Sequence, residues 1–197
     1  MEPERYCVID VETTGFSPRT DHIVEIACVA VDGFQVVGRW ATLVNPGRPI
    51  PAQATAVHGI TDAMVAAAPE AAFALRQARR LCEGRRIAAH CATFDLSFAG
   101  AWLGTEALCT MRLARLLVPE APNHKNQTLR RYLEIDRIAA ESFEPHRALS
   151  DALVSAYVLV ECRRRFGPCR AGRSWAQFID RNALVTSSQG TAATFAV

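Results

Sequence analysis

Asp10 and Glu12 are two acidic residues separated by one position, and they close a short apolar run near the start of the chain. Side chains at positions i and i+2 of a β-strand point to the same face of the sheet. If the apolar run is a strand, both carboxylates can bind one metal ion. The turn after them, Thr13-Thr14-Gly15, presents backbone N–H groups beside the acids, where a phosphate or a 3′-hydroxyl can bind.

Two further acids, Asp95 and Asp151, stand at the beginnings of later predicted helices. Each can have a purely structural role, because a carboxylate can cap a helix N-terminus and interacts favourably with the helix dipole. Four carboxylates gathered in one pocket would repel one another, and such a cluster persists when divalent cations neutralise it. Since all the ligands are oxygens, we expect Mg²⁺ or Mn²⁺, with two ions in the site.

A histidine beside such a cluster can act as the general base for a water molecule. His90 precedes Asp95 and His146 precedes Asp151 by the same number of residues, so the spacing alone selects neither. His90 ends a buried strand, where a hydrogen-bonded structural role is expected. His146 lies in a polar loop before a helix, from which its side chain can turn toward a substrate. We therefore predict His146 as the base.

The elements that must hold these residues alternate between strands and helices. Apolar runs predict five strands, and the first three are joined by short turns; the predicted strands span 5–11, 22–31, 34–44, 87–90 and 107–111. Helices are predicted over 69–82, 95–103, 112–117, 127–133 and 148–166. This order predicts an α/β domain, with a mixed sheet flanked by helices. We expect it to occupy residues 1–171, followed by a loosely ordered tail over 172–197.

The composition excludes several other classes of protein. Of the 197 residues, 50% are hydrophobic and 21% are charged, and the formal net charge is +2. These values are typical of a globular domain and argue against a disordered chain or a strongly basic nucleic-acid coat protein. Neither a membrane-spanning run nor a signal peptide is expected. The seven cysteines include no CxxC pair, which favours reduced thiols in a cytoplasmic protein.

Three segments, DVETTG, HCATFD and HRALSDA, resemble in their order and separation the three exonuclease motifs of the DEDDh group of DnaQ-like 3′→5′ exonucleases. This group includes the proofreading epsilon subunit of bacterial DNA polymerase III, ribonuclease T and oligoribonuclease. NPGRPIPAQATAVHGIT and CTMRLARLLVP are also similar to segments of this family, so the resemblance covers residues 5–166. It implies a ribonuclease-H-like fold, a mixed five-stranded sheet flanked by helices.

The resemblance also implies roles for individual residues. Asp10, Glu12, Asp95 and Asp151 match the acids that bind the metal ions, and His146 matches the general base. The residues expected to contact the substrate are Thr13, Thr14, Gly15, Phe16, Gln53 and His58.

Three positions depart from the family pattern. Gln53 stands where epsilon-like members have a glutamate, which removes a charge; Cys91 and Cys109 stand where the family often has an asparagine and an aspartate. None of the three is a predicted catalytic position, so we expect activity to be retained. Phe16 and Phe94 flank the motifs, and each either stacks on a terminal base or packs in the core.

The predicted activity is metal-dependent removal of nucleoside 5′-monophosphates from the 3′ ends of DNA, mainly single-stranded DNA. An exoribonuclease of the ribonuclease T or oligoribonuclease kind would use the same chemistry on RNA, but the VHGIT segment favours DNA. A third alternative is a polymerase-associated proofreading or binding subunit, with Trp175 and Phe178 of the tail contacting the partner. Expected partners are therefore nucleic acid 3′ ends, and a DNA polymerase subunit or a second copy of the chain, but no membrane.

Overall fold

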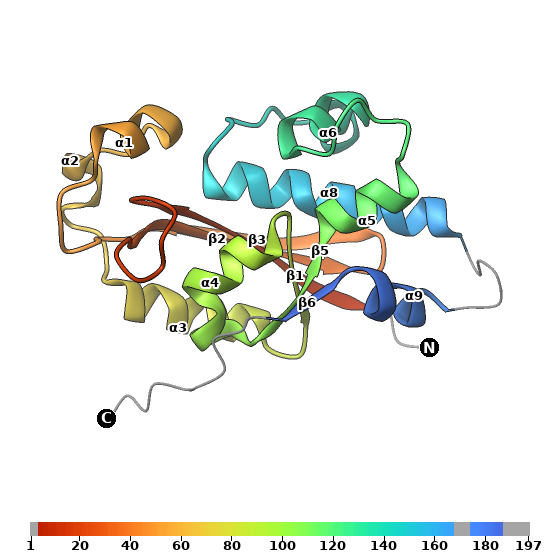
Figure 1. Cartoon of the computed structure of the whole chain (residues 1–197), viewed down its shortest axis with the longest axis horizontal. Helices are drawn as coiled ribbons and strands as arrows, with labels where there is room; N and C mark the ends of the chain where they lie inside the picture. The colour runs from red at the N-terminus through yellow and green to blue at the C-terminus, as the bar shows by residue number, and fades with distance from the viewer. Residues whose placement is uncertain (1–3, 168–173, 187–197) are drawn as a thin grey trace.

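A six-stranded mixed sheet forms the centre of the computed structural model, which describes residues 4–167 and 174–186 (Figure 1). The strands lie in the order β3-β2-β1-β4-β5-β6. β1 is antiparallel to β2 and parallel to β4, β3 is antiparallel to β2, β5 is parallel to β4, and β6 is antiparallel to β5. The strand bounds are β1 Arg5–Thr13, β2 Ile23–Asp32, β3 Gln35–Leu43, β4 Arg86–Ala89, β5 Glu106–Cys109 and β6 Leu184–Thr186.

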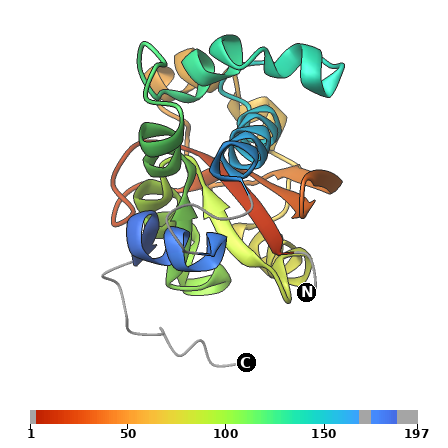
Figure 2. The same ribbon diagram turned by 90° about the vertical axis from the view of Figure 1, so that its right-hand side faces the viewer.

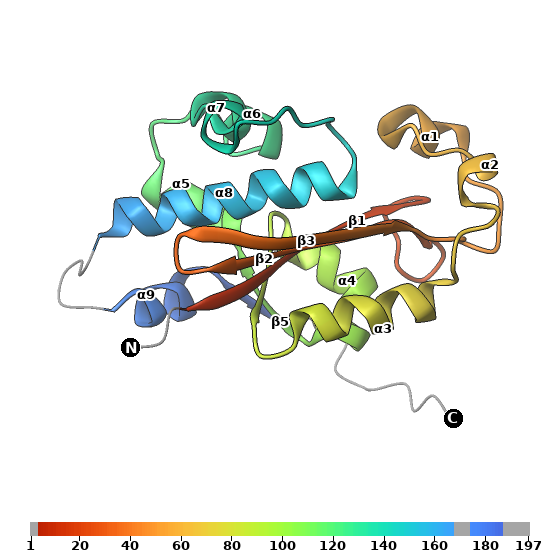
Figure 3. The same ribbon diagram turned by 180° about the vertical axis from the view of Figure 1, so that it is seen from behind.

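Helices cover both faces of this sheet. Figures 1 and 3 show α5, α6 and α8 on one face and α3 and α4 on the other, and Figure 2 shows α6 and α7 as an outer layer over α5 and α8. The helices are α1 Ala52–His58, α2 Asp62–Val65, α3 Ala71–Cys82, α4 Ala92–Leu103, α5 Thr110–Leu117, α6 Asn126–Tyr132, α7 Ile135–Ala139, α8 Ala148–Phe166 and α9 Trp175–Asn182. In the part of the chain that the structure describes, no helix has the length and apolar character needed to cross a membrane.

The central strand β1 is buried on both faces, because alternate residues contact different layers of helices. Tyr6 and Val8 belong to the core beneath α8, whereas Cys7 and Ile9 belong to the core beneath α3 and α4. Side chains alternate along a strand. Residues 10 and 12 therefore continue the α8 face of β1, at the end of the strand where α8 begins.

Five strands and five helices lie where the sequence predicted them, within a few residues, and α8 has the predicted bounds. The short helices α1, α2 and α7 were not predicted. They contain seven, four and five residues, too few to show a helical repeat in the sequence. α1 ends at Gly59, whose φ of 71° is in the left-handed region and whose N–H donates to the carbonyl of Thr55.

The predicted loosely ordered tail is wrong for residues 174–186, which form α9 and β6 and add the sixth strand to the predicted five. Ser174 caps α9 through a capping box with Gln177. The Trp175 ring packs on Phe166, and its Nε1 donates a 2.8 Å hydrogen bond to the hydroxyl of Tyr6. Aromatic packing and the cap thus order this segment, in which Trp175, Phe178 and Ile179 follow a helical spacing that the sequence prediction did not use. Residues 172, 173 and 187–197 of that prediction lie outside the described residues.

Candidate active site

Three of the four predicted metal-binding acids meet at the end of β1. Asp10 and Glu12 face the start of α8, and Asp151 lies in the first turn of that helix. One carboxylate oxygen from each lies within 4.8 Å of those from the other two. Residues 141 positions apart in the chain thus meet because α8 begins over the end of β1 (Figure 1).

The fourth acid, Asp95, is buried in the first turn of α4. Its charge acts on both Asp10 and Glu12, although it is outside the group of three carboxylates described above. The helix cap position is occupied by Cys91, so Asp95 is not the N-cap residue that its sequence position also allowed. The backbone N–H of Val11 on β1 stabilises the Asp95 carboxylate, which links α4 to the strand that carries the other acids.

Burial raises the pKa of all four carboxyl groups, and repulsion from neighbouring acids adds to this shift at Asp10 and Glu12. Burial, followed by the charges of the neighbouring acids, raises the pKa of Asp10 well above its ordinary value and that of Glu12 to about 8. Burial raises the pKa of Asp95 to about 7 and also raises that of Asp151. Divalent cations bound at such a site would offset the repulsion between the carboxylates. An all-carboxylate set of donors fits hard ions such as Mg²⁺ or Mn²⁺.

Amide side chains from α6 fix the position of Asp151. Nε2 of Gln127 donates a 2.6 Å hydrogen bond to Oδ1 of Asp151, and Nδ2 of Asn126 donates to the Asp151 carbonyl at 3.1 Å. These residues were not predicted from the sequence. The pair of adjacent amides, Asn126 and Gln127, was the available signal in the sequence. Their contact with α8 is tertiary, so the local sequence could not show it.

His146 lies directly before α8 and lines a cavity together with Glu12. Its backbone φ is 57°, a left-handed conformation that is uncommon for residues other than glycine. Its backbone N–H donates to Oδ2 of Asp151 at 3.3 Å. The structure therefore brings the predicted base beside the predicted metal ligands.

The cavity that contains His146 has a volume of about 640 Å³. All six residues predicted to contact the substrate line it, and α1 contributes two of them. They are Thr13, Thr14, Gly15, Phe16, Gln53 and His58. With Phe94 and His146, residues from four separate parts of the sequence thus line one cavity.

The hydroxyl groups of Thr13 and Thr14, in the turn after β1, form hydrogen bonds to other groups of the protein. Thr13 Oγ1 donates to the carbonyl of Gly15 at 2.6 Å, and Thr14 Oγ1 donates to Oδ1 of Asp21 at 3.2 Å. The N–H of Thr14 donates to the carbonyl of His22, so it is not one of the free N–H groups expected in this turn. A Cβ on Gly15 would lie 2.5 Å from Oδ2 of Asp21, so a larger residue there would displace the Asp21 side chain from its hydrogen bonds with Thr14 and Ser17.

His58 presents an unpaired nitrogen in this part of the structure. Its Nδ1 accepts a 3.0 Å hydrogen bond from the N–H of Ile60, and its buried Nε2 has no hydrogen-bond partner. Burial lowers the pKa of His58, which favours the neutral ring. Because Nδ1 is an acceptor, the proton of that ring is on Nε2. In this structure Nε2 is shielded from solvent beside the backbone of Thr13, which raises the pKa of the ring, although burial lowers it more.

Phe16 is 89% exposed, so the alternative of core packing is wrong for this residue. Its ring meets the edge of Phe94 with the ring centroids 6.3 Å apart, and Phe94 packs on Phe98 at 5.2 Å. Phe94 both lines the cavity and packs against the core beneath α3 and α4. The two aromatic rings thus form an apolar wall of the cavity, and the ring of Phe16 is exposed.

His90 has the structural role expected of it. Its Nδ1 lies 2.9 Å from the hydroxyl of Thr110, and its Nε2 lies 2.9 Å from the carbonyl oxygen of His124. Burial lowers its pKa to about 4. A neutral ring with both nitrogens bound cannot turn toward the acids, which separates His90 from His146 despite their equal spacing.

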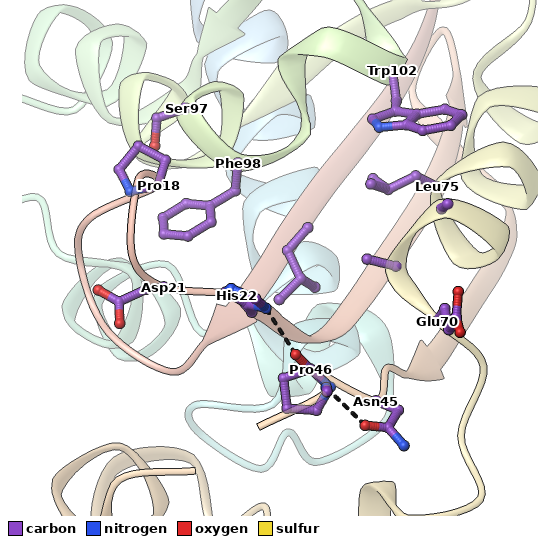
Figure 4. A pocket seen from close by; sticks show the side chains of 14 residues that line it. Pro18, Asp21, His22, Asn45, Pro46, Glu70, Leu75, Ser97, Phe98 and Trp102 are labelled. Atoms are coloured by element: carbon purple, nitrogen blue, oxygen red, sulfur yellow. Dashed lines mark hydrogen bonds between the residues drawn. The ribbon is translucent and has the colours of Figure 1, made fainter. Parts of the chain in front are cut away.

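A second cavity, of about 690 Å³, lies beyond the turn that follows β1 (Figure 4). Phe98 and Trp102 of α4 line it, together with His22, whose Nδ1 donates to the carbonyl of Pro46 at 2.7 Å. None of the predicted catalytic or substrate-binding residues lines this space. This cavity is the larger of the two, but the residues predicted to contact the substrate line the cavity that contains His146.

Comparison with known proteins gives a consistent result. The family model RNase_T, described as an exonuclease, matches residues 7–159. A DNA polymerase III subunit epsilon-like protein from Rhodobacter capsulatus is 42% identical over 161 residues, which is 77% of this chain and 22% of that protein. The 3′-5′ exonuclease DinG of Bacillus subtilis is 34% identical over 170 residues, 82% of this chain and 18% of that protein. The chain thus spans less than a quarter of the length of these two relatives.

A solved structure, Exonuclease X in complex with 5′ overhanging duplex DNA, is similar over almost its whole length. It is 32% identical, with a TM-score of 0.69, and the match covers 89% of this chain and 98% of that chain. The expected ribonuclease-H-like fold is confirmed, with one strand more than predicted. With its family match over most of its length, the chain belongs to the RNase_T exonuclease family.

Proposed function

We propose that this protein removes nucleoside 5′-monophosphates one at a time from the 3′ ends of single-stranded DNA. The observation that carries the proposal is the meeting of Asp10, Glu12 and Asp151 beside a cavity that His146 and His58 both line. These groups come from four separate segments of the chain. Their convergence supplies oxygen ligands and a base to one place.

The residues that would hold the cations are Asp10, Glu12, Asp95 and Asp151. Two divalent cations, when bound, stabilise the charge that develops on the attacking and leaving oxygens of a phosphodiester. Gln127 keeps one oxygen of Asp151 oriented by its 2.6 Å hydrogen bond. The other oxygen, Oδ2, accepts a longer hydrogen bond, 3.3 Å, from the N–H of His146.

The two histidines have different roles in the proposed reaction. His146 accepts a proton from the attacking water, whose oxygen then bonds to the phosphorus of the last linkage. The bond from this phosphorus to the 3′-oxygen of the preceding nucleotide breaks, and that oxygen takes up a proton. His58 lines the cavity and contacts the terminal nucleotide there.

The apolar wall of the cavity accommodates the terminal base. Phe16 offers an exposed ring, and Phe94 supports that ring from behind. Stacking on an aromatic ring is tolerant of base identity, because every base has a π-face. This is suited to an enzyme that must remove each nucleotide in turn.

The first test is digestion of a 5′-labelled single-stranded oligonucleotide with Mg²⁺ or Mn²⁺. We expect a ladder that shortens from the 3′ end and a nucleoside 5′-monophosphate product. Asp10→Asn should abolish this ladder, whereas Asp180→Asn should not, because Asp180 is an exposed α9 residue paired with Arg86. Equal digestion by the parent and Asp10→Asn would refute the metal assignment. A ladder from the 5′ end of a 3′-labelled strand would refute the polarity.

The choice of DNA over RNA is supported by the relatives, whose names refer to DNA polymerase III, and by a similar solved structure with bound DNA. Parallel digestion of DNA and RNA oligonucleotides of the same sequence tests it. Faster digestion of RNA would replace this proposal with an exoribonuclease. Association with a DNA polymerase subunit, assembly with a second copy of the chain, and a cytoplasmic location stay predictions, and a pull-down with polymerase subunits and a mass measurement in solution test the first two.

A further inference from the structure

Glu25 is a buried acid beside the candidate active site that has no role in the mechanism described above. It lies on β2 directly opposite Glu12 of β1, and its side chain is 4% exposed. Its charge contributes to the raised pKa values of Asp10 and Glu12. A fifth carboxylate makes the acid site less stable, so its presence there calls for a compensating contact.

That contact is made with the segment that follows His146. Nη2 of Arg147 donates to Oε1 of Glu25 at 2.7 Å and Nε donates to Oε2 at 3.2 Å, so the guanidinium and the carboxylate form a two-point pair. The backbone N–H of Ala148 adds a third hydrogen bond, to Oε2 at 2.8 Å. The same carboxylate raises the pKa of Arg147. Three donors from two consecutive residues thus converge on Glu25.

These bonds restrain the chain where the backbone conformation is unfavourable. His146 has a φ of 57°, which is costly for a residue with a Cβ and persists when surrounding contacts hold it. Its own N–H makes a longer hydrogen bond, 3.3 Å to Asp151. Glu25 therefore supplies the strongest contacts that fix the chain immediately after the predicted base.

We propose that Glu25 is a positioning residue, whose carboxylate anchors Arg147 and Ala148 and thereby holds the His146 imidazole toward the substrate cavity. The inference rests on the proposed role of His146 as the base. It assigns Glu25 no contact with the cations or the substrate. An error in base position of about 1 Å can reduce a rate by a factor of the order of 100.

The test is a double-mutant cycle on turnover. Glu25→Gln has nearly the same shape as the parent residue but lacks the charge that Arg147 binds. We expect it to lower kcat, measured at saturating Mn²⁺, by roughly 10- to 100-fold, with KM for the oligonucleotide changed less than about twofold. In a His146→Ala background the same substitution should change kcat less than about twofold, because the group that Glu25 positions is already absent. Arg147→Lys should fall between the parent and Glu25→Gln.

A matched control is Glu141→Gln. Glu141 accepts two hydrogen bonds from Arg39, at 3.0 and 2.8 Å, but this pair lies on the exposed surface. The variant should keep the parent kcat. An equal loss from Glu25→Gln in both backgrounds would overturn the proposal and indicate a direct effect on the acids or on the fold, and an unchanged kcat in the parent background would also overturn it.

A measurement without turnover separates this proposal from the proposed function. Amide hydrogen exchange of Ala148 should be faster in Glu25→Gln and in Arg147→Lys than in the parent, and the ¹H–¹³C signals of the His146 ring should shift. Unchanged exchange and ring signals would overturn the anchoring role even if the parent enzyme is active. If the parent cleaves no nucleic acid but these signals change, the anchoring stands and the assigned activity of the site is wrong.

Discussion

Neutralising Glu12 should stabilise the metal-free protein while abolishing its activity. The pKa of Glu12 is about 8 in the folded protein, against an ordinary value of 4.5. The folded state therefore binds its proton more tightly than the unfolded state does. Between about pH 4.5 and 8 the folded state carries more protons, so the free energy of unfolding must fall as the pH rises. Asp95, with a pKa of about 7 against 3.8, acts in the same direction.

The magnitude follows from these values. At pH 7, a carboxyl group whose pKa is raised from 4.5 to about 8 reduces the free energy of unfolding by about 3 kcal/mol relative to an unshifted group. The neighbouring acids share this effect, because one protonation relieves the repulsion on the others. Water also reaches the partly exposed Glu12. We therefore expect Glu12→Gln to raise the stability of the metal-free protein by about half of this amount, ~1.5 kcal/mol at pH 7.

Urea denaturation in the presence of EDTA at pH 5, 6, 7 and 8 measures this effect. The parent should lose stability steadily over this range, and Glu12→Gln should lose clearly less. Mn²⁺ at 100 times its dissociation constant should restore about 2.7 kcal/mol to the parent and much less to the variant. Glu141→Gln, at the exposed pair with Arg39, serves as the control and should follow the parent. A parent stability that is independent of pH, or a variant that is less stable than the parent at pH 8, would refute the electrostatic reasoning.

Three further predictions concern binding and stability. Phe16→Ala should raise KM for single-stranded DNA by roughly 5- to 150-fold with kcat nearly unchanged, because stacking on this exposed ring contributes about 1–3 kcal/mol; steady-state kinetics measure this. Ser174→Ala should cost about 1 kcal/mol of stability in thermal unfolding, because it removes the capping box of α9. Leu129→Ala should cost 2–5 kcal/mol, as Leu129 is fully buried on α6, and should also lower kcat because α6 carries Gln127.

Each of these predictions has a result that contradicts it. An unchanged KM for Phe16→Ala would remove the ring from the binding surface, and Phe34→Ala, at an exposed ring far from the cavity, is its control. An unchanged melting temperature for Ser174→Ala would mean that α9 does not unfold cooperatively with the rest of the domain. If Leu129→Ala destabilises the protein but leaves kcat unchanged, the packing of α6 does not control the orientation of Asp151.

The sequence located the candidate catalytic residues better than the residues that orient them. Asp10 and Glu12 could be placed on one face of a strand because side chains alternate along it, and α8 could be bounded because its apolar period is long. Gln127 and Glu25 could not be identified in this way. Their importance depends on hydrogen bonds to residues 24 and about 120 positions away, which no local pattern encodes.

The same distinction explains the choice between the two histidines. His90 and His146 have equal spacing to an aspartate, and their contexts, a buried strand and a polar loop, distinguish them. The hydrogen bonds of His90 confirm its structural role, whereas the role of His146 as the base stays a prediction. The left-handed backbone at His146 was beyond prediction, since nothing in the local sequence requires it and the contacts that maintain it are tertiary. The order in residues 174–186 was missed for a similar reason, because Trp175 is stabilised by Tyr6 from the start of the chain.

The strand β6 also determines where a fragment of this protein can end. The family match stops at residue 159, inside α8, whereas β6 pairs with β5 much later in the chain. A fragment cut at the end of the match would leave the backbone groups of β5 open to pairing with another molecule, and would uncover the ring of Tyr6. Such a fragment should self-associate during expression even though it retains every predicted catalytic residue.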